Sequence, residues 1–138
     1  YSFLSGQYGS FHSSVIGATA GEAPFVLDGL LSNPASFDPL VHYTDTGGVS
    51  DHVFALFHLL GMTFAPRLRD FPDRRLACFG SAKAWPTLSP LIGKPINEEV
   101  IRQHWGDIMR LAASIRDKSL KPSEILRKLG AYRQQNRL

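Results

Sequence analysis

The feature that most constrains the fold is a short β-rich run that ends at Asp45, continues through two glycines and leads into a strongly apolar segment. Residues 39–44 include Val, Tyr and Thr, which predicts a strand. Ser50 is a favourable N-cap for a helix over residues 50–60, and Gly61 is a typical helix stop. In open α/β sheets the carboxyl ends of strands hold ligands and catalytic groups. Asp45 is therefore a candidate catalytic residue.

Asp45 has a second interpretation, which the residues alone favour. An Asp before Gly-Gly is more often a turn residue that bonds nearby backbone amides than a catalytic group. We expect Gly47 and Gly48 to let the backbone turn sharply and to adopt positive φ. We also expect the following helix to be buried, because its residues are apolar nearly all round: Val53, Phe54, Ala55, Leu56, Phe57, Leu59 and Leu60.

The 138 residues, 43 % of them hydrophobic and 20 % charged, suffice for one ordinary packed domain. The single cysteine, Cys78, excludes an internal disulfide and agrees with a reducing compartment. No apolar run approaches the roughly 18 residues that a membrane span needs. Because the chain begins at Tyr1, inside a predicted strand and without an initiator Met, we expect it to be a piece of a longer protein.

Charge is divided unequally along the chain. Residues 1–65 contain five acids and no Lys or Arg, whereas residues 66–138 contain all 15 basic residues and seven acids, a net charge of +8. This asymmetry predicts an anionic partner for the second half, with DNA or RNA as the obvious candidate. The alternative is a solvated helical surface without a nucleic-acid partner.

Residue patterns predict the remaining elements. In the first half we expect strands at residues 1–4 and about 11–16, a helix over residues 22–31, and a strand at residues 64–69 with Pro66 at an edge or bulge. With the strand before Asp45, this order predicts an α/β fold with one mixed sheet.

The second half has a helical pattern. Asn97 is a favourable N-cap, and apolar residues then recur at spacings of 4, 3, 4 and 3, which predicts one amphipathic helix with Trp105 in the core. These residues are Ile101, Trp105, Ile108, Ala112 and Ile115. Pro122 is expected to open a last helix.

Several other chemistries lack support in the sequence. His52 and His58 are six residues apart on one helix, about 120° around it, so they cannot share a metal. Cys78 has no second cysteine to complete a zinc site. Neither a Gly-Lys-Ser/Thr phosphate loop nor a Gly-x-Ser-x-Gly elbow occurs.

The run from His42 to Asp70, HYTDTGG-x-x-DHVFAL-x-x-LLG-x-x-FAPR-x-RD, resembles the second-aspartate motif of the class II (Tn-three family) replicative transposases. Residues 5–12, 26–31 and 126–132 are similar to that family as well. The resemblance therefore covers most of the chain. It implies an incomplete ribonuclease H-like mixed sheet followed by a helical insertion region. We place the partial core at residues 1–83 and the helical region at 84–138.

The resemblance also implies a catalytic site. Asp45 matches the second of three acids that hold two Mg²⁺ ions, and the other two acids are expected before Tyr1 and after Leu138. If the strand before Asp45 and the predicted strand at residues 64–69 are parallel neighbours, Arg67 and Arg69 reach the same sheet edge as Asp45. They are then candidate phosphate contacts. The alternative is structural pairing of Arg69 with a nearby acid.

The function implied by the family is DNA transposition, in which transposon ends are cleaved and joined to target DNA. It implies DNA as partner, a homodimer or higher assembly on DNA, no membrane partner, and a bacterial cytoplasmic location. We expect the segment by itself to be inactive. The alternative is a basic nucleic-acid-binding domain without chemistry, or a truncated transposase remnant.

Overall fold

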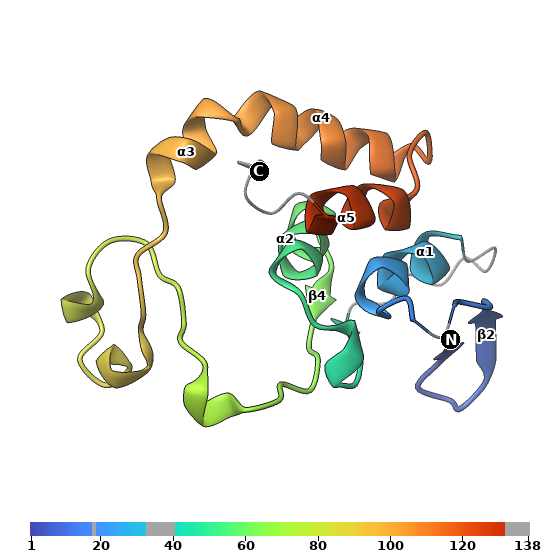
Figure 1. Ribbon diagram of the computed structural model, residues 1–138, viewed down its shortest axis with the longest axis horizontal. Coiled ribbons are helices and arrows are strands. Elements are labelled where there is room, and N and C mark those ends of the chain that lie inside the picture. The colour runs from blue at the N-terminus through green and yellow to red at the C-terminus, as the bar shows by residue number, and fades with distance from the viewer. Residues whose placement is uncertain (18, 33–40, 132–138) are drawn as a thin grey trace.

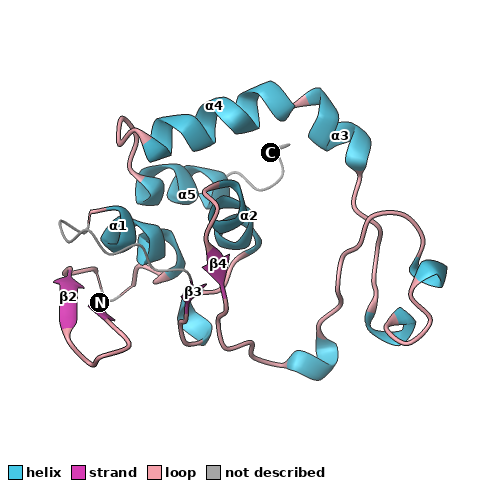
Figure 2. Cartoon of the chain, turned by 180° about the vertical axis from the view of Figure 1, so that it is seen from behind, coloured by secondary structure: helices cyan, strands magenta, loops and turns pink. Residues whose placement is uncertain are grey.

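The computed structural model describes residues 1–17, 19–32 and 41–131, and shows short strands packed beside helices (Figures 1 and 2). The strands are β1 (Ser2–Leu4), β2 (Ser10–Ser13), β3 (Val41–His42) and β4 (Thr63–Phe64). The α-helices are α1 (Val26–Leu31), α2 (Asp51–Leu59), α3 (Glu98–Gln103), α4 (Trp105–Arg116) and α5 (Pro122–Ala131). The 3-10 helices are η1 (Ala23–Phe25), η2 (Thr46–Gly48), η3 (Phe71–Asp73), η4 (Ala82–Ala84) and η5 (Ser89–Leu91). None of these helices has the length and apolar character needed to cross a membrane.

The predicted α/β content is confirmed, but the described strands form two small sheets instead of one mixed sheet. β1 pairs with β2 antiparallel, and β3 pairs with β4 parallel. The two sheets meet through side chains, because the rings of Phe3 in β1 and His42 in β3 stack with centroids 5.8 Å apart. Strands of two to four residues make few backbone bonds, so packing of their side chains largely holds them in place.

Helix α2 begins and ends where the sequence predicts. The Ser50 hydroxyl accepts a hydrogen bond from the Val53 amide at 3.2 Å, and Gly61 takes a left-handed φ of +79° just after the helix. The expectation that α2 is buried all round is wrong. One face, with Phe57 only 1 % exposed, packs on the core, whereas Phe54 on another face is 38 % exposed. The described elements α1, α4, α5 and β4 pack on α2 but leave part of the Phe54 ring exposed.

The amphipathic pattern after Asn97 yields two helices instead of the single helix predicted. Asn97 caps α3 as expected, accepting a hydrogen bond from the Val100 amide at 3.3 Å. The helix is interrupted at His104, and α4 starts at Trp105. The prediction that Trp105 lies in the core is wrong, since it is 50 % exposed. The buried residues of α4 lie nearer its other end, so Trp105 extends beyond the packed region.

A contact between distant segments joins the two halves of the chain. The Asp28 carboxylate on α1 accepts a hydrogen bond from the Ser123 amide at 2.9 Å, which satisfies a free N–H in the first turn of α5. Leu126 on α5 then reaches the core. The buried hydrophobic residues are Phe3, Val26, Leu27, Leu30, Val53, Leu56, Phe57, Phe64, Ala112, Ile115 and Leu126. One core therefore includes residues from both halves.

Candidate active site around Asp45

Asp45 lies three residues after the end of β3, and it forms the turn that its sequence context predicts. Its Oδ1 accepts a hydrogen bond from the Gly47 amide at 3.0 Å, which caps η2. The Asp45 residue is nonetheless exposed. A carboxylate has two oxygens and several lone pairs, so one bond to a backbone amide leaves acceptor capacity unused. The turn role is therefore compatible with a second role as a ligand.

The two glycines after Asp45 allow neighbouring side chains to approach closely and do not adopt positive φ, which corrects the sequence-based expectation. Among the described glycines, only Gly61 and Gly80 have positive φ. A Cβ at Gly47 would lie 2.8 Å from Oε2 of Glu22, and one at Gly48 would lie 2.7 Å from the Thr44 hydroxyl. Both distances are shorter than real side chains allow. A side chain at Gly48 would crowd Thr44, whereas the flexible end of Glu22 can shift to admit one at Gly47.

Glu22 is a neighbour of Asp45 that sequence reasoning missed. It directly precedes η1, which packs against η2. Burial raises the pKa of Glu22, and the charge of Asp45 and a hydrogen bond with Asp45 raise it further. Burial, followed by the charges of Glu22 and Asp45, raises the pKa of the Tyr1 hydroxyl to about 12. No spacing rule links positions 22 and 45, so only their tertiary contact could identify this acidic surface.

The donor groups around Asp45 are of the kind that a hard cation such as Mg²⁺ prefers, namely carboxylate oxygens. The described residues bring two of them together, on Asp45 and Glu22. No group of three or more His, Cys, Asp or Glu side chains with the arrangement of a metal site occurs among the described residues. These residues therefore supply only part of a donor set.

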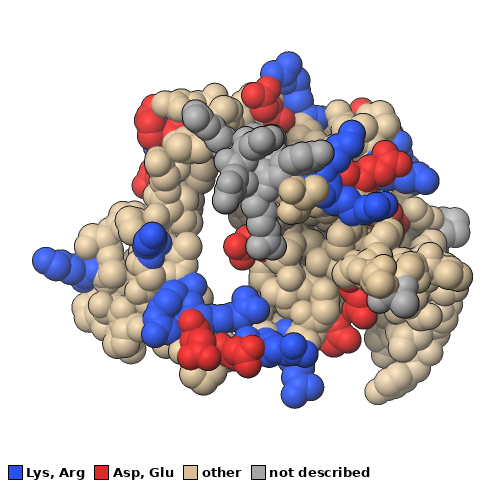
Figure 3. All heavy atoms as spheres, in the orientation of Figure 1, with Lys and Arg blue, Asp and Glu red and all other residues tan. Residues whose placement is uncertain are grey.

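Arg67 lies near the same edge as Asp45, as the parallel-strand argument predicts. The Arg67 amide donates to the Thr44 carbonyl at 2.8 Å, so the β3–β4 pairing continues beyond the strands and places Arg67 beside the residue before Asp45. Arg67 and Arg69 are exposed, and neither makes an ion pair within the described part of the chain. The expected alternative, pairing of Arg69 with a nearby acid, is thus not observed there. Basic side chains are visible along the lower edge of Figure 3.

The next two arginines are engaged in local structure. Arg74 Nε donates to the Arg69 carbonyl at 2.9 Å, and the Arg75 guanidinium donates to the carbonyls of Pro72 and Arg74. These bonds hold the chain in shape after Arg69. Arg67 and Arg69 therefore have the freer guanidinium groups for an external anion.

His42 belongs to the aromatic core and not to the exposed edge. Its ring stacks on Phe57 and Phe64 with centroids 5.8 and 6.4 Å away. Its Nε2 is buried and has no hydrogen-bond partner among the described residues. Burial lowers the pKa of His42, because the charged imidazolium loses hydration there.

We expect the His42→Phe variant to lose the part of the chain's acid sensitivity that comes from this histidine. Because the pKa of His42 is lowered on folding, its neutral form contributes stability above about pH 6.5, and this is lost as the pH falls through the lowered value. The effect is at most about 1.4 kcal/mol per pH unit for one proton. Urea denaturation at about pH 8 and about pH 5 measures it. Equal pH dependence of wild type and variant would contradict this, and exposed His58→Gln is the control.

Comparison with known proteins places the whole chain in one group. The family described as "Tn3 transposase DDE domain" matches residues 1–138. The chain is 46 % identical over 138 residues to the transposase for transposon Tn501 of Pseudomonas aeruginosa. It is 44 % identical over 138 residues to the transposase for transposon Tn21 of Escherichia coli, and 41 % identical over 138 residues to that for Tn1546 of Enterococcus faecium. All of the chain is covered in each case, but only 14 % of each relative.

Proposed function

Because the chain belongs to the Tn3 transposase DDE domain family, we propose that it is a segment of the catalytic domain of a metal-dependent DNA transposase. In this proposal the complete protein cleaves transposon ends and joins them to target DNA in the bacterial cytoplasm, as a homodimer or higher assembly on DNA. The observation that carries it is the position of Asp45 and Arg67 just beyond the ends of adjacent parallel strands, within a family match that spans the chain. The ribonuclease H-like fold and the division at residues 83 and 84 belong to the same proposal.

Asp45 is the proposed metal ligand and catalytic residue. Bound Mg²⁺ would supply activation of the attacking oxygen and stabilisation of the leaving oxygen in phosphoryl transfer. Asp45 offers an exposed carboxylate whose position is fixed by the Gly47 amide. That bond keeps the side chain at the strand end without a rearrangement on binding. The test is cleavage of a terminal-repeat duplex by a full-length transposase that carries this chain, with and without a change at Asp45.

Arg67 and Arg69 have the complementary role of holding DNA phosphates near Asp45. The Asp45 and Glu22 carboxylates repel phosphate, so cationic groups at the same edge are needed to bring the backbone close. A guanidinium offers paired donors that match phosphate oxygens. Arg67 follows β4 by three residues and its amide bonds to the Thr44 carbonyl next to Asp45, and Arg69 follows two residues later.

We expect the double variant Arg67→Ala, Arg69→Ala to bind duplex DNA more weakly, to a similar extent for all sequences. Each lost phosphate contact lowers the slope of log affinity against log salt by about 0.9, so the slope should fall by about two. Fluorescence anisotropy at several salt concentrations measures both quantities. The matched control is Arg102→Ala, Arg110→Ala, which also removes two positive charges, but from arginines already paired with Glu98 and Asp107. An unchanged slope in the first variant would exclude phosphate contact by Arg67 and Arg69.

An alternative function, nucleic-acid binding without chemistry, is supported by one observation. The described residues gather only two carboxylates at the Asp45 edge and no complete metal site. This alternative predicts the same salt-dependent binding, but no dependence of any strand cleavage on Asp45. The cleavage measurement therefore separates the two functions.

A further inference from the structure

The chain between β4 and α3 makes a long excursion away from the helices (Figure 1). We call residues 74–97 the basic arm. Its two runs are joined by backbone hydrogen bonds, from the Leu76 amide to the Leu91 carbonyl at 2.7 Å and from the Ile96 amide to the Cys78 carbonyl at 2.9 Å. The structure describes every residue of the arm, and none of them is buried. The arm therefore has a defined backbone but adds no side chain to the buried core.

The exposed side chains of the basic arm combine aromatic rings with positive charge. Phe79 and Trp85 are 61 % and 54 % exposed. The arm contains four basic residues and no acid: Arg74, Arg75, Lys83 and Lys94. On the face shown in Figure 3, the outer part of this excursion carries blue and tan atoms without red ones. Exposed aromatic residues grouped with charge of one sign are typical of a binding surface.

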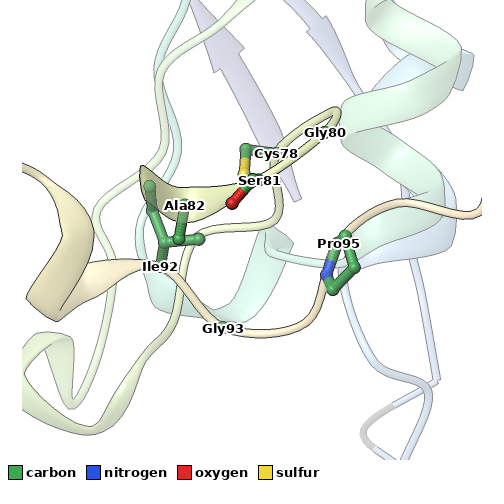
Figure 4. A pocket seen from close by; sticks show the side chains of 7 residues that line it. All are labelled: Cys78, Gly80, Ser81, Ala82, Ile92, Gly93 and Pro95. Atoms are coloured by element: carbon green, nitrogen blue, oxygen red, sulfur yellow. The ribbon is translucent and has the colours of Figure 1, made fainter. Parts of the chain in front are cut away.

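The interior of the arm also leaves room. A hollow of about 380 Å³ lies between its two runs. Figure 4 shows Cys78, Ser81 and Ala82 on one side of it, and Ile92, Gly93 and Pro95 on the other. The lining side chains are small or apolar, so they do not fill the space between the runs. The arm is thus an open ribbon whose large rings are exposed at its surface.

We propose that the basic arm binds single-stranded DNA, with Trp85 and Phe79 stacking on unpaired bases and Lys83 and Lys94 contacting the phosphates. Base stacking on aromatic side chains together with a basic surface is the usual way in which proteins hold single strands. Duplex DNA hides its base faces, so phosphate contacts alone would give the exposed rings no role. A second copy of the arm is disfavoured as the occupant, because two surfaces that carry only positive charge repel each other.

The position of the arm connects it to the candidate active site. The chain leaves the Asp45 edge through Arg67, Arg69 and η3, and it enters the arm directly afterwards. A DNA strand released near Asp45 would therefore meet cationic groups from Arg67 to the arm. Two acids, Asp70 and Asp73, lie between Arg69 and the arm. This inference rests on the proposed function for its choice of DNA as the polyanion. Its test uses binding alone and is independent of cleavage.

The chain contains two tryptophans of similar exposure, which provides a matched experiment. Trp85 is 54 % exposed on the arm, and Trp105 is 50 % exposed on α4, in a stretch of sequence that contains Glu98, Glu99 and Asp107. We would titrate the Trp105→Phe and Trp85→Phe variants of the 138-residue chain with an oligothymidine of about 12 nucleotides, within the usual site sizes. Stacking should quench the fluorescence of Trp85 in the first variant and leave Trp105 in the second nearly unchanged.

Affinities complete the test. We expect Trp85→Ala to weaken oligothymidine binding about tenfold or more, and Trp105→Ala to change it less than about twofold. Both affinities are measured by binding alone and without cleavage, which separates this inference from the catalytic proposal. Equal quenching of both tryptophans, tighter binding of a duplex of equal length, or an unchanged affinity in Trp85→Ala would overturn it. A dimer of the chain that Trp85→Ala converts to monomer would also overturn it, by showing that the arm binds protein.

Discussion

Asp45→Asn is expected to lower strand cleavage about a thousandfold or more in a full-length transposase that carries this chain, while duplex DNA binding stays nearly unchanged. The proposed role of the carboxylate is to hold metal at the scissile phosphate, and it does not grip the duplex. Loss of its negative charge also removes repulsion toward phosphate, so binding should be equal or slightly tighter. Gel analysis of a terminal-repeat duplex with Mg²⁺ or Mn²⁺ measures cleavage, and anisotropy measures binding.

The structure makes Asn a sharper substitution than Ala at this position. The amide oxygen of Asn can accept the hydrogen bond from the Gly47 amide that Oδ1 of Asp45 accepts at 3.0 Å. Asp45→Asn therefore keeps the turn and removes the charge, whereas Asp45→Ala removes both. We expect Asp45→Ala to cost about 0.5–2 kcal/mol of stability in addition, the usual range for a lost cap. Thermal unfolding of both variants separates the turn role from the chemical role.

Asp51→Asn is the control for a general effect of removing an acid near this edge, because Asp51 is exposed in the first turn of α2. It should cleave normally. The isolated 138-residue chain should not cleave, since the two carboxylates at the Asp45 edge supply only part of the donor set of a two-metal site. Normal cleavage by Asp45→Asn would mean that Asp45 is a turn residue only.

The largest expected effect on stability is that of Phe57→Ala. Phe57 is 1 % exposed, and its ring stacks on Phe64 with centroids 4.6 Å apart and on His42 at 5.8 Å. Truncation of a buried Phe removes its contacts and leaves a cavity, which costs about 3–5 kcal/mol. A domain of this size has a total stability of about 5–15 kcal/mol, so the variant should be marginally folded. Urea denaturation followed by circular dichroism measures the change.

Phe54→Ala is the matched control, because the same residue type lies on another face of the same helix. Phe54 is 38 % exposed and meets Phe64 edge-on with ring centroids 5.0 Å apart. Part of its ring is already hydrated, so we expect a loss of at most about 1.5 kcal/mol. Equal losses for the two variants would show that the two faces of α2 are equally buried in solution, as the sequence pattern alone implies.

The sequence by itself determined the local features of this protein. Ser50 and Asn97 cap helices where they were predicted to, and Gly61 stops one. The strand before Asp45 and the turn after it were also predictable. Each of these features depends on a side chain and backbone groups only a few positions away. Such short-range chemistry is fully present in the order of residues, and so is the family motif around Asp45.

The tertiary structure alone decided which surfaces are covered and which residues meet. Phe54 and Phe57 are chemically identical in the sequence, yet only Phe57 is buried. Glu22 reaches Asp45 because η1 packs on η2, a contact between segments more than twenty residues apart. Trp105 matches the helical spacing of the apolar residues, but it lies beyond the packed part of α4 and is exposed. Periodicity shows which residues can share a face, whereas burial depends on whether another part of the chain packs on that face.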